Sequence, residues 1–197
     1  MSGYFSEKEE TLSREELKSL QDERLCEIVK TVYEKVSFYR EKMSQNGITP
    51  EDIKGIGDLH KLPFLTKEDL RDQYPYGLAR PLSDCVRIQS TSGTTGRRVV
   101  AFYTQNDIDV WETCCARALV AAGANKDDVI QVAYGYGLFT GGSGLNGGSH
   151  KLGAVTLPMS SGNTERQIQF MMDLKSTVLC CTPSYAAYLG EMVNEKG

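Results

Sequence analysis

The chain has 197 residues, 40% of them hydrophobic and 24% charged, which is the composition of a water-soluble globular protein. This length accommodates one ordinary domain, or a small module with part of a larger one. The formal net charge of −4 argues against a nucleic-acid-binding protein, because such proteins carry an excess of basic side chains on one face.

Targeting and metal signals are missing from the sequence pattern. The N-terminal segment is polar and acidic, unlike a signal peptide, and no apolar run reaches the roughly 20 residues that span a bilayer. We therefore expect a cytoplasmic protein without a membrane partner. The six cysteines and two histidines lack metal-ligand spacing, so no protein metal site is predicted.

Residues 1–80 are predicted to form a mainly helical N-terminal section. Ser13 and Glu16 have the spacing of a capping box, and apolar residues recur at helical spacing over about five turns after it. Thr49 and Thr66 each precede a further short helix start.

Residues 81–197 are predicted to form the α/β part of a domain that is incomplete. Two strands, near 86–89 and 99–103, flank a run of Ser, Thr and Gly. After residue 104, strands alternate with helices, which predicts βαβ units and largely parallel strands. The predicted fold class is therefore α/β: a helical N-terminal section and a mixed, mainly parallel sheet flanked by helices.

The Ser/Thr/Gly run is the clearest functional signal. Glycine permits positive φ and close backbone approach, so consecutive N–H groups can face one anion, and the hydroxyls can donate to phosphate oxygens. The run is not a Walker A loop, which needs a Lys and opens a helix. Composition alone leaves a polar hairpin without a ligand as an equal alternative. The predicted phosphate-binding residues are Ser90, Thr91, Ser92, Gly93, Thr94, Thr95, Gly96 and Arg97.

A second candidate site follows the predicted strand at 129–134, where aromatic residues alternate with glycines. Such a segment can wall a flat apolar pocket, although packing of the same rings into the core is the alternative. The predicted pocket residues are Tyr134, Tyr136, Gly137, Phe139 and Gly141, with Tyr136 and Phe139 preferred.

The segment from Gly142 to Gly147 formally matches the dinucleotide-binding pattern GxGxxG. The match is weak, because Gln167 stands where an acidic residue is expected about 20 residues further on. We interpret the segment as a glycine-rich helix start packed closely on the sheet. A dinucleotide-dependent enzyme remains an alternative function.

The stretch from Gln89 to Gly96 resembles the phosphate loop of the adenylate-forming superfamily. Four more stretches, at 62–71, 133–142, 162–167 and 177–185, are similar to its phenylacetate–coenzyme A ligase branch. The resemblance runs in order from about Ser13 to the end of the chain. It implies that the chain is the N-terminal portion of such a ligase, within the large N-terminal domain of the adenylate-forming fold.

The resemblance also implies an activity. An aryl acid attacks the α-phosphate of ATP, giving an acyl-adenylate and pyrophosphate, and the thiol of coenzyme A then displaces AMP. ATP, Mg²⁺ and coenzyme A are the implied cofactors and substrates, the pathway is phenylacetate catabolism, and a homodimer is compatible with it. The adenine-binding motifs and the adenylation lysine are expected beyond Gly197, so we expect these residues alone to be inactive. A non-catalytic phosphate- or partner-binding module remains another alternative.

Two positive side chains stand out in this context. Lys67 occupies the first turn of a predicted helix, where a cation opposes the helix dipole. A solvated surface lysine is the alternative, but the resemblance implies that Lys67 faces the acyl-adenylate and is catalytic. The family usually has Lys directly after the last loop glycine, whereas this chain has Arg97, which keeps the charge with a different geometry.

Overall fold

The computed structural model describes residues 3–77, 81–93 and 96–196. The chain divides into two compact units, one of Thr11–Thr104 and one that joins Met1–Glu10 to Gln105–Gly197. The domain boundary between residues 80 and 81, which rested on a change in secondary structure, stays a prediction. None of the helices in the described ranges is both long and apolar enough to cross a bilayer.

The Thr11–Thr104 unit is helical up to its final hairpin, as predicted. The capping box before its longest helix is confirmed, since Glu16 N–H donates to Ser13 Oγ (3.2 Å) and Ser13 N–H donates to Glu16 Oε2 (2.9 Å). Boxes of the same kind begin at Thr49 and Thr66. The helical elements are α2 (Arg14–Lys35), α3 (Ser37–Gln45), α4 (Lys67–Asp72) and the 3₁₀ turns η1 (Pro50–Asp52), η2 (Ile56–Lys61) and η3 (Leu82–Asp84).

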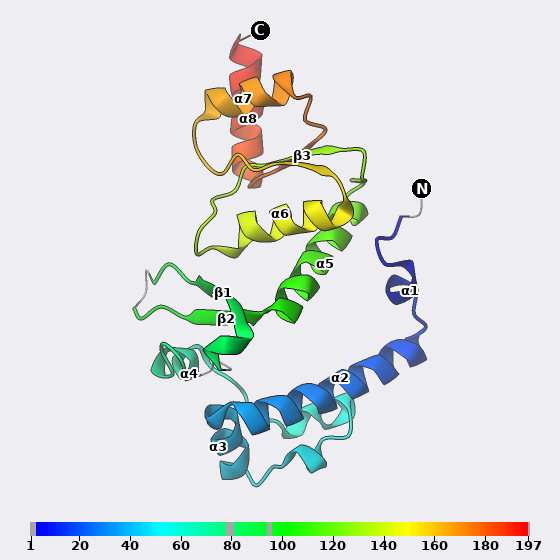
Figure 1. The fold of residues 1–197 in the computed structure, drawn as a ribbon, viewed down its shortest axis with the longest axis vertical. Coiled ribbons are helices and arrows are strands. Elements are labelled where there is room, and N and C mark those ends of the chain that lie inside the picture. Colours follow the sequence, from blue (N-terminus) through cyan, green and yellow to red (C-terminus); the bar gives the residue numbers. More distant parts are fainter. Residues whose placement is uncertain (1–2, 78–80, 94–95, 197) are drawn as a thin grey trace. The chain divides into compact units, whose positions relative to one another are not determined.

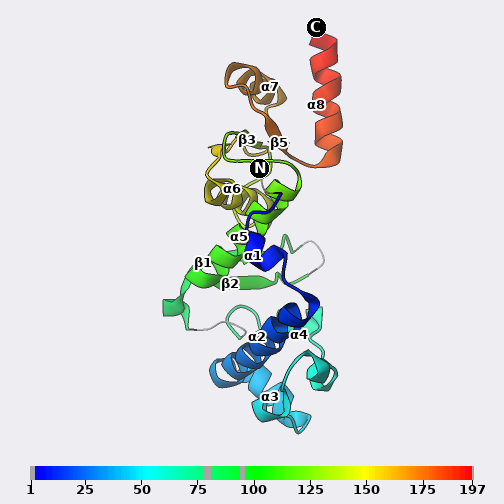
Figure 2. The same ribbon diagram turned by 90° about the vertical axis from the view of Figure 1, so that its right-hand side faces the viewer.

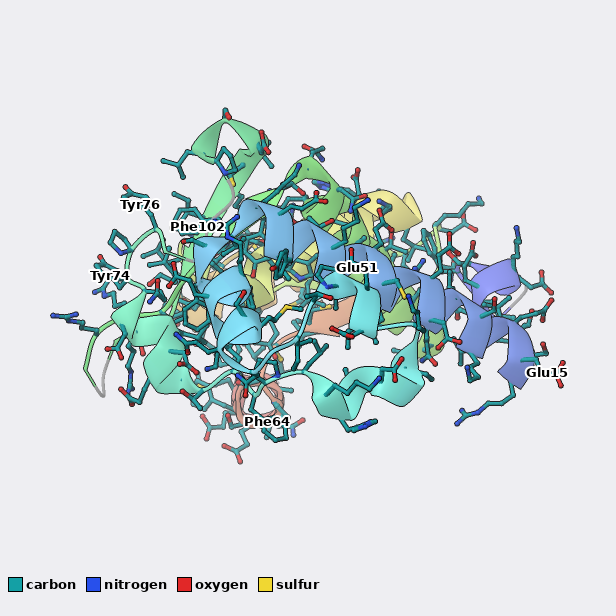
Figure 3. The ribbon with its side chains drawn as sticks, turned by 90° about the horizontal axis from the view of Figure 1, so that it is seen from below. Glu15, Glu51, Phe64, Tyr74, Tyr76 and Phe102 are labelled. Atoms are coloured by element: carbon teal, nitrogen blue, oxygen red, sulfur yellow. The ribbon has the colours of Figure 1, made fainter. Side chains whose placement is uncertain are left out.

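The small core of this unit gathers Val29, Met43 and Ile53 between α2, α3 and η1. Outside it, several large apolar side chains are exposed, and Phe64 is 91% exposed (Figure 3). Tyr76 and Phe102 lie side by side, with ring centroids 5.7 Å apart (Figure 3).

The unit ends in an antiparallel hairpin of β1 (Cys85–Ser90) and β2 (Val100–Thr104). Ile88 pairs with Phe102, and Ser90 pairs with Val100, so the two strands end together at the predicted phosphate loop. The prediction that this loop joins two strands is confirmed.

The second unit is an α/β assembly around a three-stranded parallel sheet in the order β4-β3-β5, with β3 beside β5 (Figure 2). Its core contains Leu119, Ile130 and Val132. The elements are α1 (Glu7–Glu10), α5 (Gln105–Ala121), β3 (Val129–Val132), α6 (Thr140–Leu152), β4 (Val155–Leu157), α7 (Thr164–Asp173), β5 (Val178–Cys180) and α8 (Pro183–Lys196).

The predicted α/β class with mainly parallel strands is confirmed, with one difference in detail. Among the described residues the antiparallel pair and the parallel strands form two separate sheets rather than one mixed sheet. β1 and β2 pair with each other, whereas β3 pairs with β4 and β5.

Helices α5 and α6 pack side by side through glycines (Figure 1). A Cβ on Gly148 would lie 2.5 Å from Cys115 Cβ, and one on Gly144 would overlap the Trp111 indole. These glycines were expected to pack on the sheet, but they pack on a neighbouring helix instead. Gly142 packs on the segment that follows β3, where an added Cβ would lie 2.8 Å from the Gly135 carbonyl oxygen.

Candidate functional site

The predicted phosphate loop is closed at its base by backbone hydrogen bonds. Thr91 N–H donates to Val99 O (3.0 Å), and Val99 N–H donates to Thr91 Oγ1 (3.1 Å). Ser90 Oγ donates to the Thr91 carbonyl oxygen (3.0 Å). One of the predicted phosphate-binding hydroxyls, that of Thr91, therefore also holds the hairpin together.

Both glycines of the loop adopt backbone conformations that L-residues rarely adopt. Gly93 has φ of 74° and Gly96 has φ of 130°, and Gly96 N–H donates to Gly93 O (3.3 Å) across a tight turn. A Cβ on Gly93 would lie 2.6 Å from Cγ of Arg98. The missing side chain thus lets the aliphatic part of Arg98 lie directly against the loop.

The described part of this loop is accessible. Ser92, Gly96, Arg97 and Arg98 are exposed, and Gly93 is half-buried. Thr94 and Thr95 lie outside the described residues. Two guanidinium groups and exposed polar groups on a turn of left-handed glycines can attract and bind a polyphosphate.

Lys67 is the first residue of α4, and the start of this helix is firmly fixed. The Asp69 carboxylate accepts hydrogen bonds from Lys42 Nζ (2.6 Å), Thr66 N–H (2.7 Å) and Thr66 Oγ1 (2.8 Å). These donors, Lys42 foremost, lower the pKa of Asp69 to about 2. Lys67 itself is exposed, and its amine pairs with no acid in the described ranges.

In the aromatic segment after β3, two tyrosine rings pack against the core and one phenylalanine ring is exposed. Tyr134 and Tyr136 pack against the core of the second unit, and Tyr136 OH donates to Asn146 Oδ1 on α6 (3.4 Å). Burial raises the pKa of the Tyr136 phenol, with a smaller contribution from Cys180. Phe139 is 54% exposed at the start of α6.

The glycines of this segment have different roles. Gly137 has φ of 94° and turns the chain toward α6. Gly141 lies under Tyr134, whose Cδ1 would be 3.4 Å from an added Cβ. The structure therefore places Gly141 against Tyr134 and both tyrosines against one core, whereas Phe139 is exposed. A shallow hollow of about 320 Å³ elsewhere in this unit, lined by Glu10, Cys114, Arg117, Ala118 and Ala121, contains none of the predicted site residues.

One polar cluster was missed by the sequence reasoning. Gln131 on β3 and Gln167 on α7 are both 0% exposed and are hydrogen-bonded to each other. The only sequence signal was a glutamine inside the apolar strand at 129–132, and nothing local indicated its partner 36 residues away.

The described residues include no cluster of acidic, thiol or imidazole side chains for a metal ion. No group of three or more His, Cys, Asp or Glu side chains in the described ranges could hold a metal ion. The N–H and guanidinium groups of the phosphate loop suit an anion, and its hydroxyl oxygens are of the kind that ligate the Mg²⁺ of a bound nucleotide.

The dinucleotide alternative is wrong on structural grounds. The whole GxGxxG match lies inside α6 rather than in a turn before it. From Gly144 onward its N–H groups donate to carbonyl oxygens one turn earlier in the helix, and the space beside Gly144 and Gly147 is filled by Trp111 and Glu112 of α5. No space is left there for a pyrophosphate.

Comparison with known proteins shows what the chain is similar to. No family model matches the chain. A phenylacetate–coenzyme A ligase of Thermus thermophilus is 48% identical over 189 residues, which are 95% of this chain and 42% of that protein. One from Escherichia coli is 49% identical over 92% of this chain and 42% of its own length. The chain is homologous to part of the phenylacetate–coenzyme A ligases.

Solved structures agree with this homology. A 2-hydroxyisobutyryl-CoA ligase in complex with 2-HIB-AMP and CoA superposes with a TM-score of 0.89 at 29% identity, covering 98% of this chain and 43% of that one. The family resemblance expected from the sequence is therefore confirmed, as is the adenylate-forming fold. The chain spans 42% of the length of the phenylacetate–coenzyme A ligases that it matches.

Proposed function

We propose that the protein carrying this chain is an AMP-forming aryl acid–coenzyme A ligase, with phenylacetate as its acid. The observation that carries the proposal is an exposed hairpin loop with two left-handed glycines and two arginines, in a chain 48% identical to phenylacetate–coenzyme A ligases. The geometry of the loop suits the anionic tail of a nucleotide.

In this proposal the loop holds the β- and γ-phosphates of ATP. Ser92 and the N–H groups of Gly93 and Arg97 donate to phosphate oxygens, since the Gly96 N–H already donates to Gly93 O, and the Arg97 side chain provides charge. Negative charge accumulates on pyrophosphate as it leaves, so donors already held in place stabilise the transition state more than flexible ones. Thr94 and Thr95 belong to this set on the sequence pattern.

The two hydroxyl residues at the base of the loop differ in whether their hydroxyl hydrogen is free to donate to phosphate. Thr91 accepts a hydrogen bond from Val99 and keeps its own hydroxyl hydrogen free to donate to phosphate. The Ser90 hydroxyl hydrogen is directed to the Thr91 carbonyl, so a phosphate contact from Ser90 requires rotation of its side chain. We therefore expect Ser92 to contribute more to ATP affinity than Ser90 does.

Lys67 is proposed as the catalytic cation. Its backbone is held by the Thr66–Asp69 capping box, and its amine is exposed. A fixed backbone with a free ammonium group suits a residue that pairs with a carboxylate or with the phosphate of an acyl-adenylate.

Tyr134 and Tyr136 are proposed to line the aryl-acid pocket, with Gly137 and Gly141 leaving room for a ring. Their rings are anchored at the core and present apolar edges at the end of β3. Phe139, which is exposed here, is proposed as a mobile contact at the pocket entrance. Coenzyme A is the proposed thiol substrate of the second step.

The test is acid-dependent release of pyrophosphate by the complete protein. We expect release with ATP and phenylacetate, followed by phenylacetyl-coenzyme A formation when coenzyme A is added. Lys67→Ala should lower kcat at least tenfold, whereas Lys54→Ala, which removes another exposed lysine of the same unit, should not. Absence of pyrophosphate release with every aryl acid tried would refute the proposal.

A further inference from the structure

The loop that follows β4 is held in an unusual conformation at the carboxyl end of the parallel sheet. Ser160, Gly162 and Asn163 have φ of 63°, 84° and 49°. Left-handed conformations cost a non-glycine residue about 1 kcal/mol or more, so surrounding contacts must hold this loop in place. In open α/β sheets, ligands bind at this carboxyl end of the strands.

The contacts that hold the loop come from the buried glutamine pair. Gln167 Nε2 donates to Ser160 O (2.8 Å) and, more weakly, to Gly162 O (3.4 Å). Gln131 Nε2 in turn donates to Gln167 Oε1 (2.7 Å) and to the Gln167 carbonyl oxygen (3.1 Å). Ser176 Oγ donates to Gln131 Oε1 (2.8 Å). We call these three side chains, Gln131, Gln167 and Ser176, the glutamine clamp.

The clamp is completely buried at its centre, and both amide oxygens and both amide nitrogens of the two glutamines have partners. A buried amide costs free energy unless it is hydrogen-bonded, so an apolar pair would build a simpler core. The amides add a fixed orientation of the loop, because their chain of hydrogen bonds ends on the loop backbone.

The clamped loop lies against the aromatic segment. Ser160 N–H donates to Val132 O at the end of β3 (3.2 Å). A Cβ on Gly135 would lie 3.5 Å from Ser161 Oγ. The loop thus contacts the backbone between Tyr134 and Tyr136, the two rings proposed above to line the pocket.

We propose that Gln131 and Gln167 are positioning residues that hold residues 160–163 against Gly135, and that this loop forms a wall of the aryl-acid pocket. The inference rests on the proposed function for the identity of the ligand. The wall limits the space beside Tyr134 and Tyr136, so the clamp favours acids with a single aromatic ring over acids with two fused rings.

The test uses a double substitution, Gln131→Met/Gln167→Met. Replacing both partners of a buried hydrogen bond by apolar groups of similar shape can be nearly neutral in stability, while the hold on Ser160 is lost. Gln169→Met is the matched control, because Gln169 is an exposed residue on the same helix. Ser176→Ala, which removes one donor only, is a milder variant that serves if the double variant does not fold.

Two quantities are measured on the complete protein. Amide hydrogen exchange of residues 160–163 reports the loop alone, whether or not the protein binds an acid. The dissociation constants of phenylacetate and 1-naphthylacetate report the pocket. In the double variant we expect exchange to accelerate about tenfold and the preference for phenylacetate to fall about tenfold, with smaller changes of the same sign in Ser176→Ala and none in Gln169→Met.

Each result has a distinct meaning. Unchanged loop exchange in a folded clamp variant would overturn the positioning role. Faster exchange with an unchanged preference between the two acids would overturn the wall. If the parent protein binds neither acid, but loop exchange still accelerates in the double variant, the proposed function and the wall would be overturned. The clamp would then remain the cause of the loop conformation.

Discussion

The phosphate loop and the glutamine clamp use polar groups in opposite ways. In the loop, Ser92, Arg97 and Arg98 are exposed, and glycines replace side chains where the backbone turns. In the clamp, Gln131 and Gln167 are fully buried, and their amide groups are saturated by protein partners. The loop keeps hydrogen-bonding capacity for a ligand, whereas both amide groups of the clamp donate within the protein.

This difference separates two kinds of functional residue. A group that binds a ligand needs free donors and an accessible position, so its loss should affect binding more than folding. A group that positions others needs saturated contacts, so its loss should affect folding and local order first. Substitutions in the two regions should therefore differ in which measurement they change.

The largest effect is expected from a single substitution in the clamp. Gln131→Met removes one partner and leaves Gln167 Oε1 and the Ser176 hydroxyl without theirs in a buried site. We expect the free energy of unfolding to fall by about 3 kcal/mol, measured by urea denaturation. Gln169→Met should change it by less than about 0.5 kcal/mol. Equal stabilities of the two variants would show that the clamp is not stabilising.

Gly93→Ala should have the next largest effect, and mainly on ligand binding. An added Cβ would be strained at φ of 74° and would displace Arg98, which it would approach to 2.6 Å. We expect ATP affinity to fall about 30-fold, or about 2 kcal/mol, by titration calorimetry. Gly47→Ala is a good control, since Gly47 has φ of 67° with open space around it. It should cost stability without changing ATP affinity.

Substitutions at Thr91 and Ser92 should distinguish a hydroxyl that closes the loop from one that binds the ligand. Thr91→Val removes the acceptor of the Val99 N–H, so we expect a loss of about 1 kcal/mol in stability. Ser92→Ala should leave stability unchanged and lower ATP affinity several-fold. A reversed pattern, with Ser92 important for folding and Thr91 only for binding, would contradict the roles assigned above.

The smallest effect is expected at Asp69, which anchors the helix that carries Lys67. Its pKa of about 2 lies below the ordinary value near 3.9 of an unfolded chain. The stabilisation of the folded protein by the ionised Asp69 carboxylate is therefore fully present above about pH 4 and is lost as the pH falls toward 2. Asp69→Asn should lower the urea midpoint slightly at pH 6, and the difference from the parent should shrink near pH 2.5. A difference that grows in acid would contradict this sign.

Local sequence patterns predicted features that depend on local geometry. The capping box at Ser13 and the helix starts after Thr49 and Thr66 each depend on about four neighbouring residues, and all three predictions are confirmed. The turn of the phosphate loop was likewise foreseeable, because only glycine adopts the φ values of Gly93 and Gly96 without strain.

Features that depend on distant contacts were not predictable in this way. Gln131 and Gln167 meet only because β3 and α7 pack together, and no local sequence pattern around either residue indicates its partner. Periodicity could not distinguish glycines packed on the sheet from glycines packed on α5, because both arrangements need small residues on one helix face. The roles of Tyr134, Tyr136 and Lys67 in binding stay predictions for the same reason.

The central claim is that the loop around Gly93 binds the phosphates of ATP. The most direct measurement is a calorimetric titration of the complete protein with ATP and with pyrophosphate, repeated with Gly93→Ala. We predict that pyrophosphate competes with ATP and that the substitution weakens both ligands by the same factor. ATP binding that is unaffected by Gly93→Ala and by pyrophosphate would contradict the account.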